Sequence, residues 1–189
     1  MEACRTEAGL SLLELLIVLI IGAILITLVG NAWGPLTERM KATTLQSNVH
    51  RAFTLARTLA VEKNTITTLC PLTPTGDCSN DWNQPVGIFL DPANNRRVLN
   101  DAALIKRLSL HTTGTLKPSN APGGPRRYFQ FSPDGSSRGT AGHLTWCPPS
   151  GQNQRARHVR INFGGRLLWS RDNNGDGIVE DANGRNVSC

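Results

Sequence analysis

Residues 9–29 have the sequence GLSLLELLIVLIIGAILITLV, a glycine followed by an almost unbroken apolar run. The twenty residues after the glycine would span roughly 30 Å as an α-helix, about the thickness of a bilayer's hydrocarbon core. An ordinary secretory signal has a basic start and a small-residue cleavage site. Here Arg5 stands against Glu2 and Glu7, and no Ala-x-Ala pattern follows the run. The stretch is therefore predicted to be a membrane-spanning helix.

Glu14 is the only ionisable residue within this apolar run. A charged side chain inside a bilayer costs roughly 2.5 kcal/mol or more, so it is expected to pair with a cation and to have a function. If the chain is cut between Gly9 and Leu10, the new α-amino group of Leu10 can pair with Glu14 of a neighbouring subunit. Burial between packed helices then favours assembly in register. The alternative is a plain membrane anchor with an incidental glutamate.

A polar nine-residue leader that ends in glycine, a hydrophobic residue directly after it and a carboxylate five positions into the remainder resemble the class III signal of type IV pilins and pseudopilins. The resemblance implies that prepilin peptidase removes residues 1–9 by cutting between Gly9 and Leu10. It also implies N-methylation of Leu10 by the same enzyme and an assembly role for Glu14. Leu10 departs from the family pattern, in which the first mature residue is usually Phe.

Beyond the transmembrane segment, residues 10–30, the sequence indicates a second helical segment and one β-rich domain. The glycines and the proline between residues 30 and 35 are expected to bend or loosen the helix. Within residues 31–64, apolar positions at three- and four-residue steps predict an amphipathic stalk helix that ends near Asn64; they are Val49, Ala52, Phe53, Ala56, Leu59 and Ala60. Residues 65–189 suffice for one compact head.

The head shows short or alternating apolar runs separated by Pro, Gly, Asn and Asp, a pattern typical of β-strands. Candidate strands are residues 65–70, 86–90, 104–110, 127–131, 143–147, 157–163 and 166–170. Gly164 and Gly165 suit a two-residue turn between the last two strands. In that register Arg160 faces Trp169, His158 faces Arg171 and Ile161 meets Leu168, which predicts a basic, aromatic outer face. Residues 118–125 are predicted to be a mobile Pro/Gly-rich loop.

Four cysteines remain after the leader, which contains Cys4, is removed. An exported domain lies in an oxidising compartment where disulfides persist. Three pairings are formally open. Cys70 and Cys78 enclose a short Pro/Gly/Asp loop, which favours a local bridge, and Cys147 with Cys189 would then tie the last residue to the sheet. Zinc is the rival interpretation, but no C-x-x-C spacing occurs and the histidines are scattered.

Several short motifs of the head resemble the GspH/FimT family of type IV minor pilins and type II secretion pseudopilins. They are Thr67-Thr68-Leu69-Cys70-Pro71, Gly76-Asp77-Cys78, Asp81-Trp82, Gly87-Ile88-Phe89, Asp91, Phe131-Ser132-Pro133-Asp134-Gly135, Leu144-Thr145-Trp146-Cys147 and Arg157-His158-Val159-Arg160-Ile161. The resemblance implies an α+β, pilin-like fold in which a long N-terminal helix packs on a small β-rich head. It also implies a single-pass inner-membrane protein with its head in the periplasm, incorporated into a pilus or pseudopilus.

The function implied is that of a non-catalytic structural subunit that initiates or caps a type IV pilus or a type II secretion pseudopilus. Its partners would be other minor and major pilins or pseudopilins, prepilin peptidase and the inner membrane, with no small-molecule substrate. The alternative is a minor pilin that binds double-stranded DNA for uptake in natural transformation. No nucleophile with a base and orienting group, no Walker loop and no dinucleotide motif occurs, so the sequence does not indicate an enzyme.

A net charge of +6 favours an acidic partner or nucleic acid, or it is simply a solvated surface. The basic residues gather in the pairs Arg96-Arg97, Lys106-Arg107 and Arg126-Arg127 and between residues 155 and 171. The DNA-uptake relatives of this family carry a Gly-Arg-x-Arg motif, and two segments here keep its first arginine and lose the second, at Arg166 and Arg185. The DNA alternative therefore assigns phosphate contacts to Arg160, Arg166, Arg171 and Arg185.

No cofactor is expected unless a calcium ion binds near the end of the chain. Asp172, Asn174 and Asp176 stand at positions one, three and five of a loop that has Gly177 at position six, as in a calcium loop. Asn183 occupies position twelve, where such loops have a bidentate Glu, so Glu180 or Asp181 would have to replace it. The competing interpretation is a simple Asn/Gly/Asp turn.

Overall fold

The computed structural model describes residues 11–111 and 113–189, with the side chains of residues 28–32 and 35 left out of the description. Helix α1 (Leu12–Glu62) is its first element. The Ser11 hydroxyl caps the helix by accepting a hydrogen bond from the Glu14 N–H at 3.2 Å. At the other end Asn64 has a positive φ of 46° and the Thr65 N–H bonds to the Ala60 carbonyl. Asn64 thus ends the helix as predicted.

Residues 30–35, where the glycines and the proline are expected to bend or loosen the helix, do not interrupt it, because the backbone is helical through all of them. A proline removes only one backbone donor, and an isolated glycine costs a helix about 1 kcal/mol, which the long hydrogen-bonded segments on both sides can absorb.

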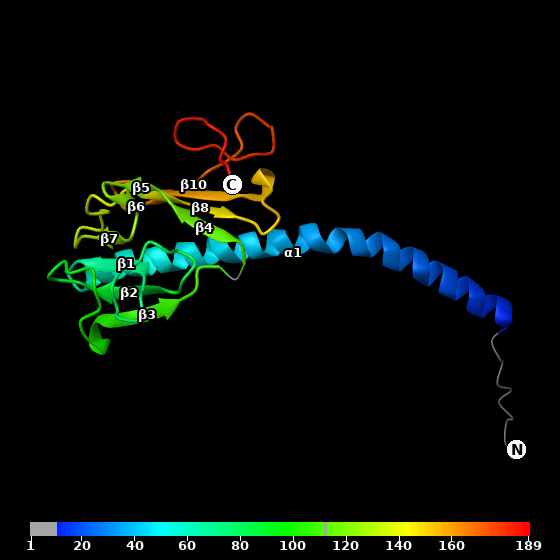
Figure 1. Ribbon diagram of the computed structural model, residues 1–189, viewed down its shortest axis with the longest axis horizontal. Coiled ribbons are helices and arrows are strands. Elements are labelled where there is room, and N and C mark those ends of the chain that lie inside the picture. The colour runs from blue at the N-terminus through cyan, green and yellow to red at the C-terminus, as the bar shows by residue number, and fades with distance from the viewer. Residues whose placement is uncertain (1–10, 112) are drawn as a thin grey trace, which may run out of the picture. The chain divides into compact units, whose positions relative to one another are not determined.

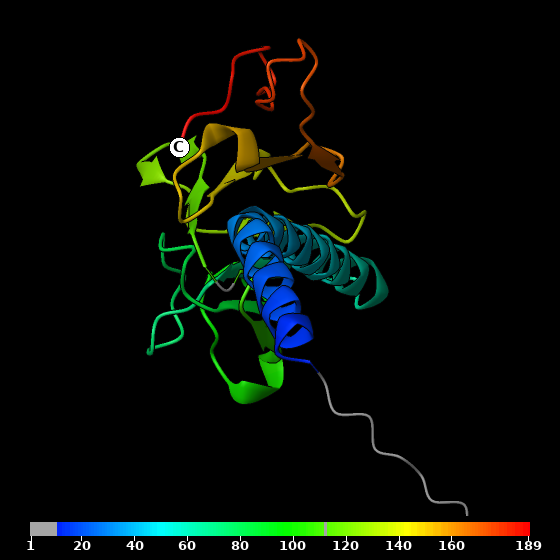
Figure 2. The same cartoon turned by 90° about the vertical axis from the view of Figure 1, so that its right-hand side faces the viewer.

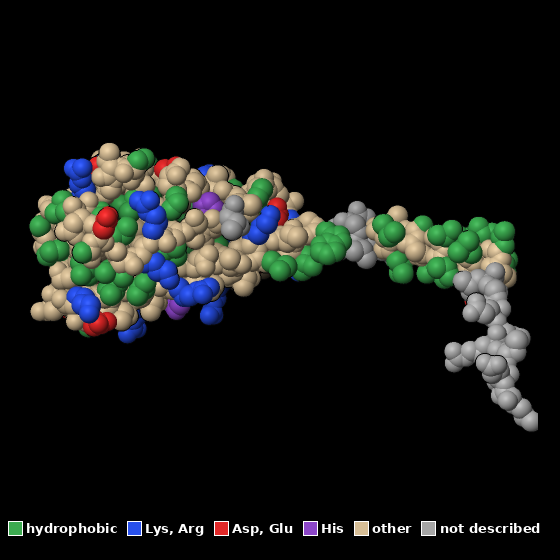
Figure 3. All heavy atoms as spheres, turned by 90° about the horizontal axis from the view of Figure 1, so that it is seen from below, with side chains coloured by type: hydrophobic (Ala, Val, Ile, Leu, Met, Phe, Trp, Pro, Cys, Tyr) green, Lys and Arg blue, Asp and Glu red, His purple; other side chains and the backbone are tan. Residues whose placement is uncertain are grey.

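The described part of the chain divides into two compact units, one that ends at Thr37 and one that covers residues 38–189. In the first unit, large apolar side chains are exposed along α1 (Figure 3); Leu12, Val18 and Ile26 are examples. Judged on the described residues alone, no helix meets the length and apolarity that a bilayer crossing requires. Residues 1–10, which contain the predicted leader and cleavage site, and the side chains of residues 28–32 lie outside the description.

The second unit contains two four-stranded antiparallel sheets. The first has the order β3-β2-β1-β7, with β1 (Thr67–Pro71), β2 (Val86–Leu90), β3 (Leu104–Leu108) and β7 (Phe129–Phe131). The second has the order β10-β9-β8-β4, with β4 (Thr115–Pro118), β8 (Gly142–Cys147), β9 (Arg157–Ile161) and β10 (Leu167–Trp169). A small hairpin pairs β5 (Asn120–Ala121) with β6 (Gly124–Pro125). Short 3₁₀ turns cover Asp101–Ala103 and Asn153–Arg155.

The C-terminal half of α1 lies between these two sheets (Figures 1 and 2). All six apolar stalk positions predicted from the sequence are buried in this core. Phe53 is 2% exposed and its ring lies 5.1 Å from that of Phe129 and 6.3 Å from that of Phe131, both edge to face. From the other sheet, Trp146 and Val159 join the same core. One helix face therefore fills the space between both sheets.

All seven predicted strands are present with shifts of a few residues at their ends, but β4, β5 and β6 were not predicted. The predicted loop 118–125 contains the β5–β6 hairpin and the last residue of β4. Pro122 and Gly123 form its turn, and Gly123 has a φ of 94°, as expected for a Pro-Gly turn. Two-residue strands of small residues give almost no hydrophobic alternation, so periodicity does not reveal them.

The predicted register of the last hairpin is wrong by one residue. Ile161 pairs with Leu167, Arg160 with Leu168 and Val159 with Trp169. The Asn162 side chain accepts a hydrogen bond from the Arg166 N–H at 2.9 Å, which adds a residue to the turn. A shift of one residue moves side chains to the opposite face of a strand. Trp169 therefore packs against the core, and the predicted pairing of Arg160 with Trp169 does not occur.

Replacing Phe53 by Ala should destabilise the head by about 3–5 kcal/mol, because the change leaves a cavity between the helix and the first sheet. Urea unfolding of the full chain in detergent, followed by tryptophan fluorescence, measures the change. Thr54→Ala, at the exposed neighbouring position, is the control and should shift the unfolding midpoint little. Equal shifts for the two variants would contradict the central position of Phe53.

Candidate functional site

Glu14 lies in the first turn of α1 and is exposed. Ser11 and Glu14 have the S-x-x-E spacing of a helix-capping box, a sequence pattern that predicts a helix start at Ser11. A carboxylate in the first turn is also favoured by the positive end of the helix dipole. Among the described residues, Glu14 forms no ion pair. Its carboxylate is thus placed at the start of the helix, whereas Gly9 and Leu10 lie outside the described residues.

Both predicted disulfide bridges are present. Cys70 at β1 is joined to Cys78, and Cys147 at the end of β8 is joined to Cys189, each with a Cα–Cα distance of 5.5 Å. The last residue is held further by hydrogen bonds from Lys117 Nζ to its carbonyl oxygen and from its N–H to Asn153 Oδ1. The second bridge therefore fastens the C-terminal segment to the second sheet.

The face of the second sheet that points away from α1 has a histidine pair at its centre. The rings of His143 and His158 are 4.6 Å apart, and His158 Nδ1 lies 2.8 Å from Thr145 Oγ1. Within the described part of the chain, His158 Nε2 and Arg160 Nε are buried and have no hydrogen-bond partner. Burial, followed by the charges of His143 and Arg160, lowers the His158 pKa to about 4, against a smaller opposing effect of Asp181. His158 is thus neutral at pH 7.

The four arginines predicted to contact DNA differ in exposure and in ion pairing. Arg160 is half-buried on β9, whereas Arg166 and Arg171 are exposed on either side of β10. Arg185 pairs with Asp181 at 3.1 Å. Because Trp169 faces the core, these arginines share their surface with no tryptophan from β10. Arg166 and Arg171 remain the two best placed for an external anion.

The predicted calcium ligands lie in one loop and bond to that loop's own amides. Asp172 accepts hydrogen bonds from the N–H groups of Gly175 and Gly177, and Asp176 accepts one from Ile178. The Glu180 carboxylate is buried and accepts bonds from residues 173 and 174. Across the described residues, no three acidic, histidine or cysteine side chains are grouped to hold a metal ion. Calcium binding therefore stays a prediction.

Two family models match this chain, one over part of the stalk and head and one over the N-terminal segment. A family model described as type II transport protein GspH matches residues 46–165, and a model of the prokaryotic N-terminal methylation motif matches residues 4–30. Curated protein sequences give no significant match.

Among solved structures, the fold is similar to that of the type IV minor pilin FimU of Pseudomonas aeruginosa. That match has a TM-score of 0.53 and 19% identity and covers 72% of this chain and 93% of FimU. The minor pseudopilin EpsH from the type 2 secretion system of Vibrio cholerae matches with a TM-score of 0.45 and 14% identity, over 68% of this chain and 94% of EpsH. The similarity to FimU supports the α+β arrangement of a long helix and a β-rich head.

Acidification should destabilise the head through His158. Its pKa falls from 6.5 to about 4 on folding, so the unfolded chain binds more protons between these values. The free energy of unfolding should therefore decrease as the pH falls through this window, by about 2 kcal/mol between roughly pH 7 and pH 5. Chemical unfolding at several pH values measures the slope. His158→Gln should flatten the slope, and the exposed-site control His50→Gln should not; equal slopes in both variants would exclude this role.

Proposed function

Because this chain belongs to the GspH family of type II transport proteins, we propose that it is a minor pilin or pseudopilin that initiates or caps a type IV pilus or a type II secretion pseudopilus. The family match covers residues 46–165, which include the end of the stalk and most of the head. The methylation motif over residues 4–30 supports the same role. The observation that carries the proposal is the isolated carboxylate of Glu14 at the start of an apolar helix.

In this proposal, prepilin peptidase cuts between Gly9 and Leu10 and methylates the new amino group of Leu10. The mature chain is then held in the inner membrane by its apolar segment. The Leu10 ammonium group of one subunit pairs with the Glu14 carboxylate of the next as their helices pack together. In a low-dielectric environment such a pair is stronger than in water, and an unpaired Glu14 would be costly. The pair therefore favours the one alignment of neighbouring helices that brings Leu10 of one subunit next to Glu14 of the other.

The head carries out its part in the periplasm, and this role requires no catalysis, cofactor or small-molecule substrate. The two disulfides suit that compartment, where thiols are oxidised. They fix the loop after β1 and the C-terminal segment, so the head presents defined surfaces to neighbouring subunits. Assembly with other pilins or pseudopilins follows from membership in the family.

Replacing Glu14 by Ala should leave membrane insertion intact but abolish incorporation into the filament, because the Leu10 ammonium group of the adjacent subunit then lacks its partner. Fractionation of cells into membranes and sheared filaments, followed by immunoblotting, measures both steps. Glu62→Gln removes an exposed carboxylate at the far end of the same helix and is the matched control, expected to assemble normally. Normal incorporation of the Ala variant would refute the proposed pairing.

Binding of double-stranded DNA is a second candidate function, favoured by Arg166 and Arg171. Both are exposed, and neither takes part in an ion pair among the described residues. If they contact phosphate, the full chain in detergent should shift duplex DNA in a gel at low salt, and the shift should weaken steeply as salt is raised. The double variant Arg166→Gln/Arg171→Gln should lose the shift. The double control Arg51→Gln/Arg107→Gln should keep it, and no shift at low salt would exclude DNA binding.

A further inference from the structure

A hollow of about 650 Å³ lies at the side of the head, between the disulfide loop after β1 and the β5–β6 hairpin. Three basic residues line it: Arg96, Arg126 and Arg127. They come from two of the arginine pairs noted in the sequence, and the proposed function uses none of them. We call this hollow the arginine pocket. Its volume is within the range of sites that bind small ligands or a few side chains.

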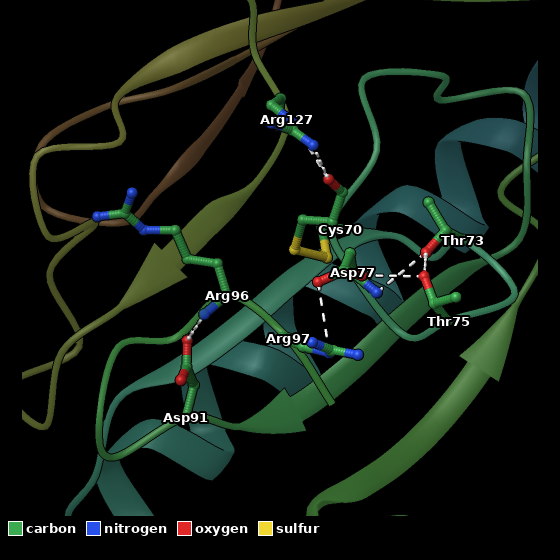
Figure 4. A network of polar contacts seen from close by, with 9 residues as sticks. Cys70, Thr73, Thr75, Asp77, Asp91, Arg96, Arg97 and Arg127 are labelled. Carbon is green, nitrogen blue, oxygen red and sulfur yellow. Dashed lines mark hydrogen bonds and ion pairs between the residues drawn. A yellow bond between two sulfur atoms is a disulfide. The ribbon is translucent and has the colours of Figure 1, made fainter. Parts of the chain in front are cut away.

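The structure holds each guanidinium group in place through neutral partners. Arg127 donates from Nε and Nη2 to the Cys78 carbonyl, at 3.1 and 2.7 Å (Figure 4). Arg126 donates from Nη2 to the Ala141 carbonyl at 2.7 Å. The Arg96 guanidinium lies over the Tyr128 ring, 4.7 Å from its centre. These contacts orient the cations but leave their charges uncompensated.

The pocket has little negative charge of its own. Among the described residues that line it, Asp77 is the one carboxylate, and it is already paired with Arg97 at 3.4 Å and accepts a hydrogen bond from Thr75 at 2.9 Å (Figure 4). None of the ion pairs found among the described residues includes Arg96, Arg126 or Arg127. The three arginines that line the pocket thus have no ion-pair partner among the described residues, and the Asp77 carboxylate is engaged by Arg97. This excess of positive charge suits an external anion.

The part of the pocket formed by the β5–β6 hairpin is accessible to an extended ligand. Gly123 and Gly124 in the β5–β6 hairpin have open space where a side chain would start. A peptide backbone can therefore approach this part of the pocket closely without meeting side chains.

From these features we propose that the arginine pocket binds an acidic peptide segment of a partner protein, with Asp or Glu carboxylates on the guanidinium groups of Arg96, Arg126 and Arg127. The planar guanidinium matches a carboxylate through two parallel hydrogen bonds. Duplex DNA fits less well, because proteins read it with elements that protrude into its grooves. Single-stranded nucleic acid binds by stacking bases on aromatic faces, and Arg96 already covers one face of Tyr128.

This inference does not rest on the proposed role in assembly, because the pocket lies wholly within the head. Fluorescence polarisation of a labelled hexaglutamate peptide, added to the full chain in a non-ionic detergent at low salt, tests it. Binding should saturate and weaken with salt, whereas hexaglutamine should not bind. Arg96→Gln should reduce the affinity about fivefold, roughly the effect of losing one partly exposed ion pair. Arg51→Gln, which removes an equal charge on α1, should leave the affinity unchanged.

Arg96→Glu provides a second variant. Among the described residues the Arg96 side chain forms no hydrogen bond, and its backbone N–H, which donates to Asp91, is present in the variant as well. This variant should weaken binding further than Arg96→Gln. Equal affinities for the Arg96 and Arg51 variants would overturn the proposal, as would the absence of saturable binding. Displacement of the peptide by inorganic phosphate or by oligo-thymidine at a lower concentration than by unlabelled hexaglutamate would assign the pocket to another class of ligand.

Discussion

Burial of one face of α1 between two β-sheets is the constraint on which the head depends. Neither four-stranded sheet can bury its apolar face alone, and the stalk helix supplies a common surface for both. Small side chains on that face, at Ala52, Ala56 and Ala60, let the sheets approach, while Phe53 fills the space next to Phe129 and Phe131. The same helix continues without a break to Leu12. The element that organises the head therefore also carries the segment proposed to assemble the filament.

The sequence predicted the features that repeat over many residues or that depend on a single strong chemical signal. The helical face of the stalk, the seven longer strands and both disulfides belong to this group, because periodicity and cysteine spacing report burial and proximity directly. The β9–β10 register could not be predicted in the same way. Two glycines suggested a tight turn, but the turn is one residue longer and is closed by a hydrogen bond from the Arg166 N–H to the Asn162 side chain. A single local contact thus decided which face carries Trp169.

Among the candidate site residues too, some could be predicted from the sequence alone and others depend on tertiary contacts. Glu14 was identified because a lone carboxylate in an apolar run is anomalous by itself, whatever the fold. The DNA hypothesis depended on side chains sharing one face, and it lost its aromatic component when the register shifted. The arginine pocket was outside the reach of sequence reasoning, since residues 96 and 126–127 meet only through the packing of the first sheet and its loops. The proposed filament assembly therefore depends on the N-terminal segment, whereas the proposed binding of an acidic peptide depends on the head.

The proposed assembly requires that Glu14 meet an amino group created at Leu10, and this amino group exists only if the leader is removed there. Intact-mass and N-terminal peptide mass spectrometry of the protein, isolated from cells with a working prepilin peptidase, measures where the chain begins. The chain is expected to begin with N-methylated Leu10. A chain that retains residues 1–9, or one cut after the apolar run, would contradict the proposed assembly.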